Sequence, residues 1–203
     1  MSGLLWASLI TNLAYLPGLL TLHHSLSRTK TAYPFVALYT STFPASGLTA
    51  LLSRGISTLA DPRFQETWTK LVVFSLQGVF DRIVLLDGDM LDPCNCALTT
   101  HHPDPSEAHT TLAPTTSSVG ILNSGLLVVQ PNQELLSEAL EGLWMPIPYV
   151  YNVQKPMRTE GVHSAFWRDK EIKNVHYIFA VKPWQEEPVT EVGPAGVDVL
   201  NIR

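Results

Sequence analysis

The chain alternates short, continuous apolar runs with stretches in which apolar residues recur at helical spacing. Apolar runs of this length, bounded by polar residues or prolines, are typical of strands that are buried on both faces. Such runs predict strands at 4–10, 35–39, 82–86, 121–129 and 175–180. Helices are expected at 17–28, 45–52, 68–76 and 133–143. Buried strands that alternate with helices predict an α/β fold with a mostly parallel sheet flanked by helices.

Two segments lack either pattern. Residues 99–118 are rich in Thr, Ser, Pro and His, and we expect an exposed loop there. Residues 185–203 contain prolines and glycines and are expected to form a loose C-terminal tail. The remaining residues, 1–184, are predicted to form a single domain.

The N-terminal run needs separate treatment because no charged residue precedes Arg28. Residues 4–22 are long and apolar enough to suggest a membrane helix, which would anchor the chain in the secretory pathway or Golgi. The run has no basic segment before it, however, and Pro17-Gly18 interrupts it. A buried strand, a polar turn and a helix that begins near Pro17 explain the pattern better, so a membrane partner is not favoured.

Composition and charge narrow the class of protein. The chain has 203 residues, of which 45% are hydrophobic and 15% charged, so it can form a core. Its net charge is −5 and no run of Lys or Arg stands out, which argues against nucleic acid as a partner. The two cysteines, Cys94 and Cys96, are too close for an unstrained disulfide, and we interpret them as free thiols. Free thiols favour the cytoplasm.

The first candidate for chemistry is Asp87-Gly88-Asp89, which directly follows the strand at 82–86. Ligands of open α/β sheets bind at the carboxyl ends of strands. Two carboxylates with a glycine between them suit a hard divalent cation that also binds phosphate oxygens. A polar turn, or a phosphatase in which the first Asp attacks phosphate, would also fit this short motif.

His176 and Lys182 form a second candidate near the end of the chain. His176 lies on an apolar strand, where it could complete the metal site, and Lys182 could contact the phosphates. Each residue also has a simpler interpretation, as a buried histidine in the core and as a solvated lysine.

The third candidate is Asn123-Ser124-Gly125, which interrupts the strand at 121–129. Short polar side chains within a buried strand need hydrogen-bond partners, and sugar hydroxyls are suitable ones. A β-bulge at Gly125 is the alternative.

Taken in order, these motifs resemble glycosyltransferase family 8, which includes glycogenin and galactinol synthase, and the sequence is most similar to fungal members. The resemblance extends over nearly the whole chain. Its segments are Ser8-Leu9-Ile10-Thr11-Asn12-Leu13-Ala14-Tyr15, Trp68-Thr69-Lys70-Leu71, Val84-Leu85-Leu86-Asp87-Gly88-Asp89-Met90, Leu122-Asn123-Ser124-Gly125, Asn132-Gln133-Glu134-Leu135-Leu136, Tyr151-Asn152, His176-Tyr177-Ile178 and Lys182-Pro183-Trp184.

The resemblance implies a GT-A fold, a Rossmann-like sheet that binds a nucleotide-diphospho-sugar. It implies transfer of a hexose, with retention of configuration, from UDP-glucose or UDP-galactose to an acceptor that is a sugar, a polyol or a protein. The implied cofactor is Mn²⁺, and the family permits a homodimer.

The family's roles transfer to matching positions of this chain. Asp87, Asp89 and His176 would hold the metal. Lys182 would contact the diphosphate, and Lys70 would face the nucleotide-sugar. The backbone at Gly88 would allow the nucleotide-sugar to approach closely. The uridine pocket would consist of Leu9, Thr11, Asn12 and Tyr15. Asn123, Ser124 and Gln133 would meet the donor sugar, and Asn132 with Gln133 would form the catalytic pair.

The sequence also departs from the family. Asn132 stands where an Asp is usual, and the glycine usual after the His-containing strand is replaced within Ile178-Phe179-Ala180. Segments of the family are missing at Ala60-Asp61, after Leu91 and between Val129 and Asn132, so an incomplete version of the fold is expected. The alternative is therefore a catalytically inactive, truncated member that at most binds a nucleotide or a protein partner.

Overall fold

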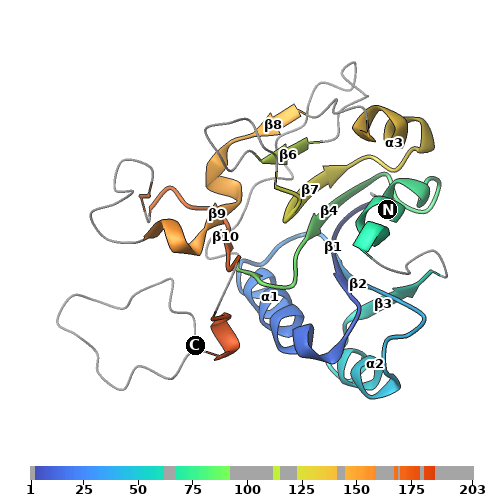
Figure 1. Cartoon of the computed structure of the whole chain (residues 1–203). Coiled ribbons are helices and arrows are strands. Elements are labelled where there is room, and N and C mark those ends of the chain that lie inside the picture. The colour runs from blue at the N-terminus through green and yellow to red at the C-terminus, as the bar shows by residue number, and fades with distance from the viewer. Residues whose placement is uncertain are drawn as a thin grey trace.

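The fold is described from a computed structural model (Figure 1), which describes residues 3–61, 67–91, 112–114, 123–140, 145–158, 167–168, 170–178 and 181–185. It is an α/β structure with a central sheet and helices beside it. The chain positions its candidate chemistry around one end of this sheet.

The main sheet has seven strands in the order β3-β2-β1-β4-β7-β6-β8. Their bounds are β1 Leu4–Ile10, β2 Phe35–Tyr39, β3 Ser57–Ala60, β4 Arg82–Leu86, β6 Leu112–Pro114, β7 Leu126–Val129 and β8 Met145–Ile147. The pairs β3-β2, β2-β1, β1-β4 and β6-β8 are parallel. Strand β7 is antiparallel to both of its neighbours, β4 and β6.

The reversed direction of β7 determines what lies near the carboxyl end of β4. Leu126, the first residue of β7, pairs with Leu86, the last residue of β4. The last residue of β7, Val129, pairs with Ile83. The segment before β7 therefore lies at the carboxyl end of β4, and the segment after β7 lies at the other end of the sheet.

A small second sheet has the order β5-β10-β9. Its strands are β5 Met90–Leu91, β9 Val153–Gln154 and β10 Val175–His176. Strand β10 pairs antiparallel with β5 and parallel with β9. Since β5 begins directly after the Asp87-Gly88-Asp89 turn, this sheet brings late segments of the chain to the end of β4.

The helices are η1 Leu13–Tyr15, α1 Leu16–Arg28, α2 Ala45–Leu52, η2 Thr67–Ser75, α3 Gln133–Leu140, η5 Tyr149–Tyr151, η6 Lys155–Arg158 and η7 Pro183–Gln185. Helices α1 and α2 share one buried cluster with strands of the main sheet, and η2 and α3 share a second. One buried cluster joins α1 to alternate side chains of β1 and β4, such as Trp6 and Val84. A second joins the opposite faces of the same strands, through Leu5 and Leu85, to Phe74 of η2. The alternation is that of strands buried on both faces.

The expected α/β fold and mostly parallel sheet are confirmed. Strands β1, β2 and β4 and helix α2 have the predicted bounds, and the apolar N-terminal run divides into β1 and α1 as expected. Among the described residues, no helix has both the length and the apolar character needed to cross a membrane.

Other predictions differ from the structure. Strand β3 was not expected, and residues 112–114, expected within an exposed loop, form β6 in the main sheet. Of the strand expected at 175–180, the structure describes residues 175–178, and within them the pairing with β5 and β9 ends at His176. The helix expected at 68–76 is a 3-10 helix. Cys94, Cys96 and residues 186–203 of the expected tail lie outside the described residues.

Helix α1 approaches the turn after β4 very closely, and this contact can be tested. A Cβ atom at Gly18 would meet the carbonyl oxygen of Gly88 and the ring of Trp184. Replacement of a helical glycine by alanine ordinarily stabilises a helix by about 0.5–1 kcal/mol. We predict that Gly18→Ala instead lowers the free energy of unfolding by about 1–3 kcal/mol, because backbone atoms must move apart. Urea denaturation measures the sign, and a gain in stability would contradict the close contact.

Candidate metal and phosphate site

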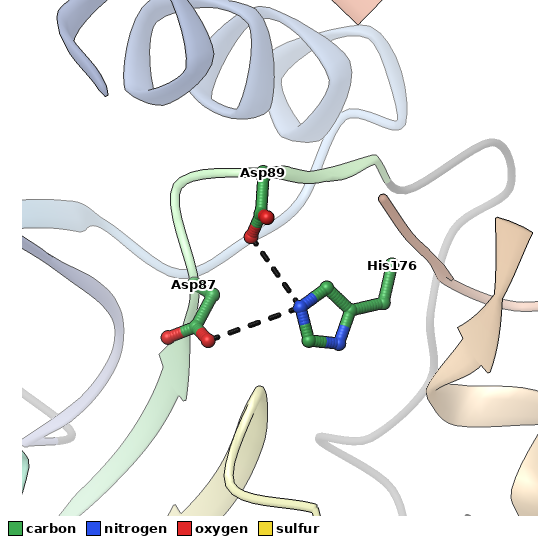
Figure 2. A group of neighbouring side chains, drawn as sticks. All are labelled: Asp87, Asp89 and His176. Carbon is green, nitrogen blue, oxygen red and sulfur yellow. Dashed lines mark ion pairs between the residues drawn. The ribbon is translucent and has the colours of Figure 1, made fainter. Parts of the chain in front are cut away.

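The two aspartates lie in a turn at the carboxyl end of β4. Asp87 follows Leu86, and the turn closes with a hydrogen bond from the Met90 amide to the Asp87 carbonyl oxygen at 3.2 Å. The Asp87 amide donates to the carbonyl oxygen of Gly125 at 2.8 Å. Asp89 is buried, with 8% of its surface exposed. Gly88 separates the two carboxylates and leaves both on the side that faces β10 (Figure 2).

His176 reaches the aspartates because β10 pairs with β5. His176 lies opposite Met90 in this pairing, and the amide of Tyr177 donates to the carbonyl oxygen of Asp89 at 2.9 Å. Its Nε2 atom lies 3.4 Å from Asp89 Oδ1 and 3.9 Å from Asp87 Oδ2. Figure 2 shows one ring nitrogen directed at both carboxylates. His176 is buried, with 4% of its surface exposed, so neighbouring residues restrict the position of the ring.

The three side chains fit a divalent cation. Asp87, Asp89 and His176 each offer a ligand atom, and these atoms all lie within 4.8 Å of one another. An octahedral cation with bonds of about 2.1 Å places neighbouring ligand atoms about 3 Å apart and opposite ones about 4 Å apart. The observed separations need only a small contraction to reach this range. Two carboxylates and one imidazole are ligands that several divalent cations accept.

Two lysines complete the charge around the aspartates. Lys70, from η2, lies 2.6 Å from Asp87 Oδ1, and its Nζ also donates to the Ser124 carbonyl oxygen at 3.3 Å. Lys182 lies 2.6 Å from Asp89 Oδ2 and donates to the carbonyl oxygen of Tyr177 at 2.6 Å. Each carboxylate thus has an ammonium group on one side and His176 on the other.

The two carboxyl groups differ in their electrostatics. Burial raises the pKa of Asp87 above its ordinary value, even though Lys70 and His176 oppose this effect. Burial would also raise the pKa of Asp89, but hydrogen bonds from His176 and Lys182 outweigh it and hold that pKa below its ordinary value. Asp89 is therefore the carboxylate that its neighbours keep ionised, which suits an anionic ligand of a cation.

A chain of buried hydrogen bonds holds the other side of the imidazole. Nδ1 of His176 lies 3.1 Å from Oδ1 of Asn152, which is completely buried. The side-chain NH₂ group of Asn152 donates to Oδ1 of Asn123 at 3.0 Å, and the same oxygen accepts from the backbone amide of Gly125 at 2.8 Å. The sequence predicted Asn123 as a sugar contact but gave Asn152 no role. The only sequence signal for this position was that Tyr151-Asn152 is one of the segments that resemble the family.

The segment after β1 lies beside the turn that contains Gly88. Thr11, Asn12 and Tyr15 are exposed at the carboxyl end of β1, and Leu9 is partly buried in the core. A Cβ atom at Gly88 would lie 3.9 Å from the carbonyl oxygen of Tyr15. The candidate uridine residues and the aspartates are therefore neighbours.

Residues 181–185 cover the same end of the sheet from the C-terminal side. The ring of Trp184 packs edge-on against Tyr15, with centroids 6.4 Å apart, and it also lies against Gly18. Val181 has a φ of 49°, in the left-handed region that β-branched residues rarely adopt. This conformation directly precedes Lys182, whose ammonium group contacts Asp89.

Asn132 and Gln133, the expected catalytic pair, are not brought to the aspartates. They follow Val129, which pairs with Ile83 at the other end of β4. Asn132 instead begins α3, where its Oδ1 accepts a hydrogen bond from the Glu134 amide at 2.8 Å. The catalytic role expected of these two residues stays a prediction, and the contact that the structure shows for Asn132 is a helix cap.

Comparison with solved structures places this arrangement in a known fold. The chain is similar to the glycosyltransferase GlyE of Streptococcus pneumoniae TIGR4, with a TM-score of 0.66 and 14% identity over 92% of this chain. It is also similar to the galactosyltransferase LgtC in complex with donor and acceptor sugar analogs, with a TM-score of 0.64 and 15% identity over 88% of each chain. Mouse xyloside xylosyltransferase 1 gives a TM-score of 0.55 at 10% identity, over 85% of this chain and 96% of that one.

These similarities concern the fold. The resemblance to glycosyltransferases of the GT-A fold is confirmed at that level. No protein-family model and no curated protein matches the sequence. The chain spans 57% of the length of GlyE.

The close approach of β7 to His176 gives a test of the metal geometry. A Cβ atom at Gly125 would meet Cε1 and Nδ1 of His176 and would lie 2.8 Å from Asn123 Oδ1. We predict that Gly125→Ala displaces the imidazole and weakens the binding of a divalent cation, with Mn²⁺ as the probe, at least about tenfold, in the range that disturbed outer-shell contacts cause. Titration calorimetry measures the affinity. Unchanged Mn²⁺ binding would mean that the ring position does not matter to the cation.

Proposed function

We propose that the chain is a metal-dependent glycosyltransferase of family 8. It would transfer the hexose of UDP-glucose or UDP-galactose to a sugar, polyol or protein acceptor, with retention of configuration. The observation that carries this proposal is the convergence of Asp87, Asp89 and His176 at the carboxyl end of β4, in a glycosyltransferase fold. This is the end of an open α/β sheet where ligands bind.

Charge balance supports a diphosphate as the ligand. In the metal-free protein, two aspartates face two lysines, so their formal charges cancel. A divalent cation would add two positive charges to this buried region. The diphosphate of a nucleotide-sugar carries about two negative charges and would restore neutrality, which makes the cation and the diphosphate natural joint ligands.

The residues of the site would then divide the work. Asp87, Asp89 and His176 would hold Mn²⁺, which supplies positive charge to the departing diphosphate when bound. Lys182 and Lys70 would exchange part of their contact with the aspartates for contact with phosphate oxygens. Their ammonium groups would stabilise the negative charge that develops on UDP as the bond to the sugar breaks.

The nucleotide and the sugar would occupy opposite sides of the aspartates. The exposed Thr11, Asn12 and Tyr15, together with Leu9, would contact uridine. The backbone at Gly88 would allow the nucleotide-sugar to approach closely. Asn123 and Ser124 lie on the β7 side of Asp87 and would face the donor sugar. The side-chain oxygen Oδ1 of Asn123 already accepts two hydrogen bonds. A sugar hydroxyl would therefore meet the side-chain NH₂ group of Asn123.

A second candidate function is nucleotide binding without transfer. The position of Asn132 and Gln133 at the far end of β4 favours it, since the expected catalytic pair does not lie beside the donor site. The cation and phosphate contacts do not depend on these two residues. This alternative predicts UDP binding with Mn²⁺ and no glycosylated product.

The charge argument predicts that Mn²⁺ and UDP bind cooperatively. Each ligand should raise the affinity for the other by about 5–150-fold, and the two factors should be equal because the coupling is reciprocal. Asp89→Asn should abolish metal-dependent UDP binding, because it removes the carboxylate held in the ionised state. Calorimetric titrations of UDP with and without Mn²⁺ measure these effects.

A matched control for Asp89→Asn is Glu171→Gln, which removes the same charge from an exposed carboxylate. The control should bind UDP and Mn²⁺ as the wild-type protein does. If the wild-type protein binds no UDP when Mn²⁺ is present, both candidate functions are wrong.

Product analysis separates transfer from binding. Incubation with Mn²⁺ and a panel of UDP-sugars should yield UDP and a hexose or a hexosylated acceptor with UDP-glucose or UDP-galactose, detected by mass spectrometry. Asp89→Ala should abolish this reaction, whereas Glu171→Gln should retain it. Turnover that persists in Asp89→Ala would contradict the metal assignment.

A further inference from the structure

We propose that Trp184 is a positioning residue, whose ring holds the ammonium group of Lys182 beside Asp89 through its contact with helix α1. In this role Trp184 touches neither a cation nor a phosphate. The role of Lys182 toward a diphosphate rests on the proposed function, whereas its place in the ligand-free protein is a property of the structure alone.

Residues 182–185 form one compact turn, in which the lysine and the tryptophan share a short, fastened backbone. Lys182 directly precedes the 3-10 helix η7, which Gln185 ends. The Gln185 amide donates to the Lys182 carbonyl oxygen at 2.8 Å, and the Lys182 amide donates to Oε1 of Gln185 at 3.0 Å. This return of a glutamine side chain to the first amide is typical of a capped helix start. The backbone of Lys182 therefore follows the backbone of Trp184.

Trp184 fastens this turn to helix α1 at a point where the helix has no side chain. A Cβ atom at Gly18 would meet two carbon atoms of the Trp184 ring, so the ring lies directly on the helix backbone. The ring also packs edge-on against Tyr15, with an angle of 70° between the two planes. Aromatic pairs of this kind add to the stabilisation that burial provides. Since α1 belongs to the buried core, Trp184 rests on a fixed base.

The ion pair with Asp89 is a weak anchor by comparison. The ammonium group of Lys182 lies 2.6 Å from Asp89 Oδ2 and donates to the Tyr177 carbonyl oxygen at 2.6 Å. These contacts fix only the end of a long, flexible side chain. Before the lysine, the backbone at Val181 has a φ of 49°, which is costly for a branched residue. Lys182 therefore needs a second point of attachment, and within the part of the chain that the structure describes Trp184 provides it.

The need for this attachment increases when an anion binds. A phosphate oxygen that accepts a hydrogen bond from Lys182 competes with Asp89 for the same ammonium group. The contact of Trp184 with α1 does not use that ammonium group, so it persists during the exchange. Trp184 thereby limits the conformational freedom that Lys182 would otherwise lose on binding, and such preorganisation raises the affinity for a diphosphate.

A double-mutant cycle in the ligand-free protein tests the place of Lys182 without reference to activity. Urea denaturation gives the stability that Trp184→Ala removes from the wild-type protein and from Lys182→Met. The loss should be smaller in Lys182→Met, because the contact with Asp89 is then already absent. It should be unchanged in Lys70→Met, which removes the other ammonium group of the site. Equal losses in all three backgrounds would overturn the proposal.

Calorimetric titration of UDP in the presence of Mn²⁺ tests the role toward a diphosphate. Lys182→Met should weaken UDP binding about 10–100-fold, the range for a hydrogen bond from a charged group. Trp184→Ala should weaken it at least about fivefold in the wild-type and Lys70→Met backgrounds, but less than about twofold in Lys182→Met. A full loss in Lys182→Met would mean that Trp184 acts on the nucleotide through Tyr15, and the positioning role would be wrong.

Conservative variants separate positioning from general packing. Trp184→Phe keeps an aromatic ring against Gly18, so it should recover most of the UDP affinity that Trp184→Ala loses and retain the coupling to Lys182. Trp184→Leu keeps apolar volume without a ring, and it replaces Trp184→Ala in both cycles if that variant does not fold. If the urea cycle shows the coupling but the wild-type protein binds no UDP, the positioning of Lys182 stands and the transferase proposal fails.

Discussion

Two carboxylates that are separated by one residue and partly withdrawn from water repel each other, and the rest of the site compensates for this repulsion. Lys70 and Lys182 each neutralise one of them, and His176 lies between them. These three residues come from η2, from the segment before η7 and from β10, so distant parts of the chain meet at one turn. A site built in this way requires the whole α/β framework around β4, because no single segment supplies enough compensating charge.

The sheet explains why these segments can meet. The parallel pairing of β1 with β4 places the exposed loop after β1 beside the aspartates, and the short β5 extends the turn into a second sheet that carries His176. The reversal of β7 brings Asn123 to the same place. Backbone pairing between strands brings each of these segments to the aspartates. The sheets therefore set the geometry of the site before any ligand binds.

Much of this could be predicted from the sequence, and the errors have physical causes. The apolar runs of β1, β2 and β4 predicted their own bounds, because strands buried on both faces leave a strong local pattern. Strands β5 and β9 have two residues each and exist through their partner β10, so no local pattern marks them. Strand β3 lies at the edge of the sheet with its terminal residues exposed, which weakens its apolar signal. The sequence does not reveal that β7 runs antiparallel, so it could not show that Asn132 and Gln133 follow β7 at the other end of β4. The hydrogen bonds of Asn152 join it to two residues that are 24 and 29 positions away, and the sequence alone cannot reveal such contacts.

The left-handed backbone at Val181 needs other contacts to hold it in place. A branched residue in that region stores roughly 1–3 kcal/mol, and the contacts of Trp184 and Lys182 with the first helix and the second aspartate hold it in place. Loss of those contacts would let the backbone at Val181 relax, so the place of Lys182 beside Asp89 depends on the packing of Trp184 against the first helix.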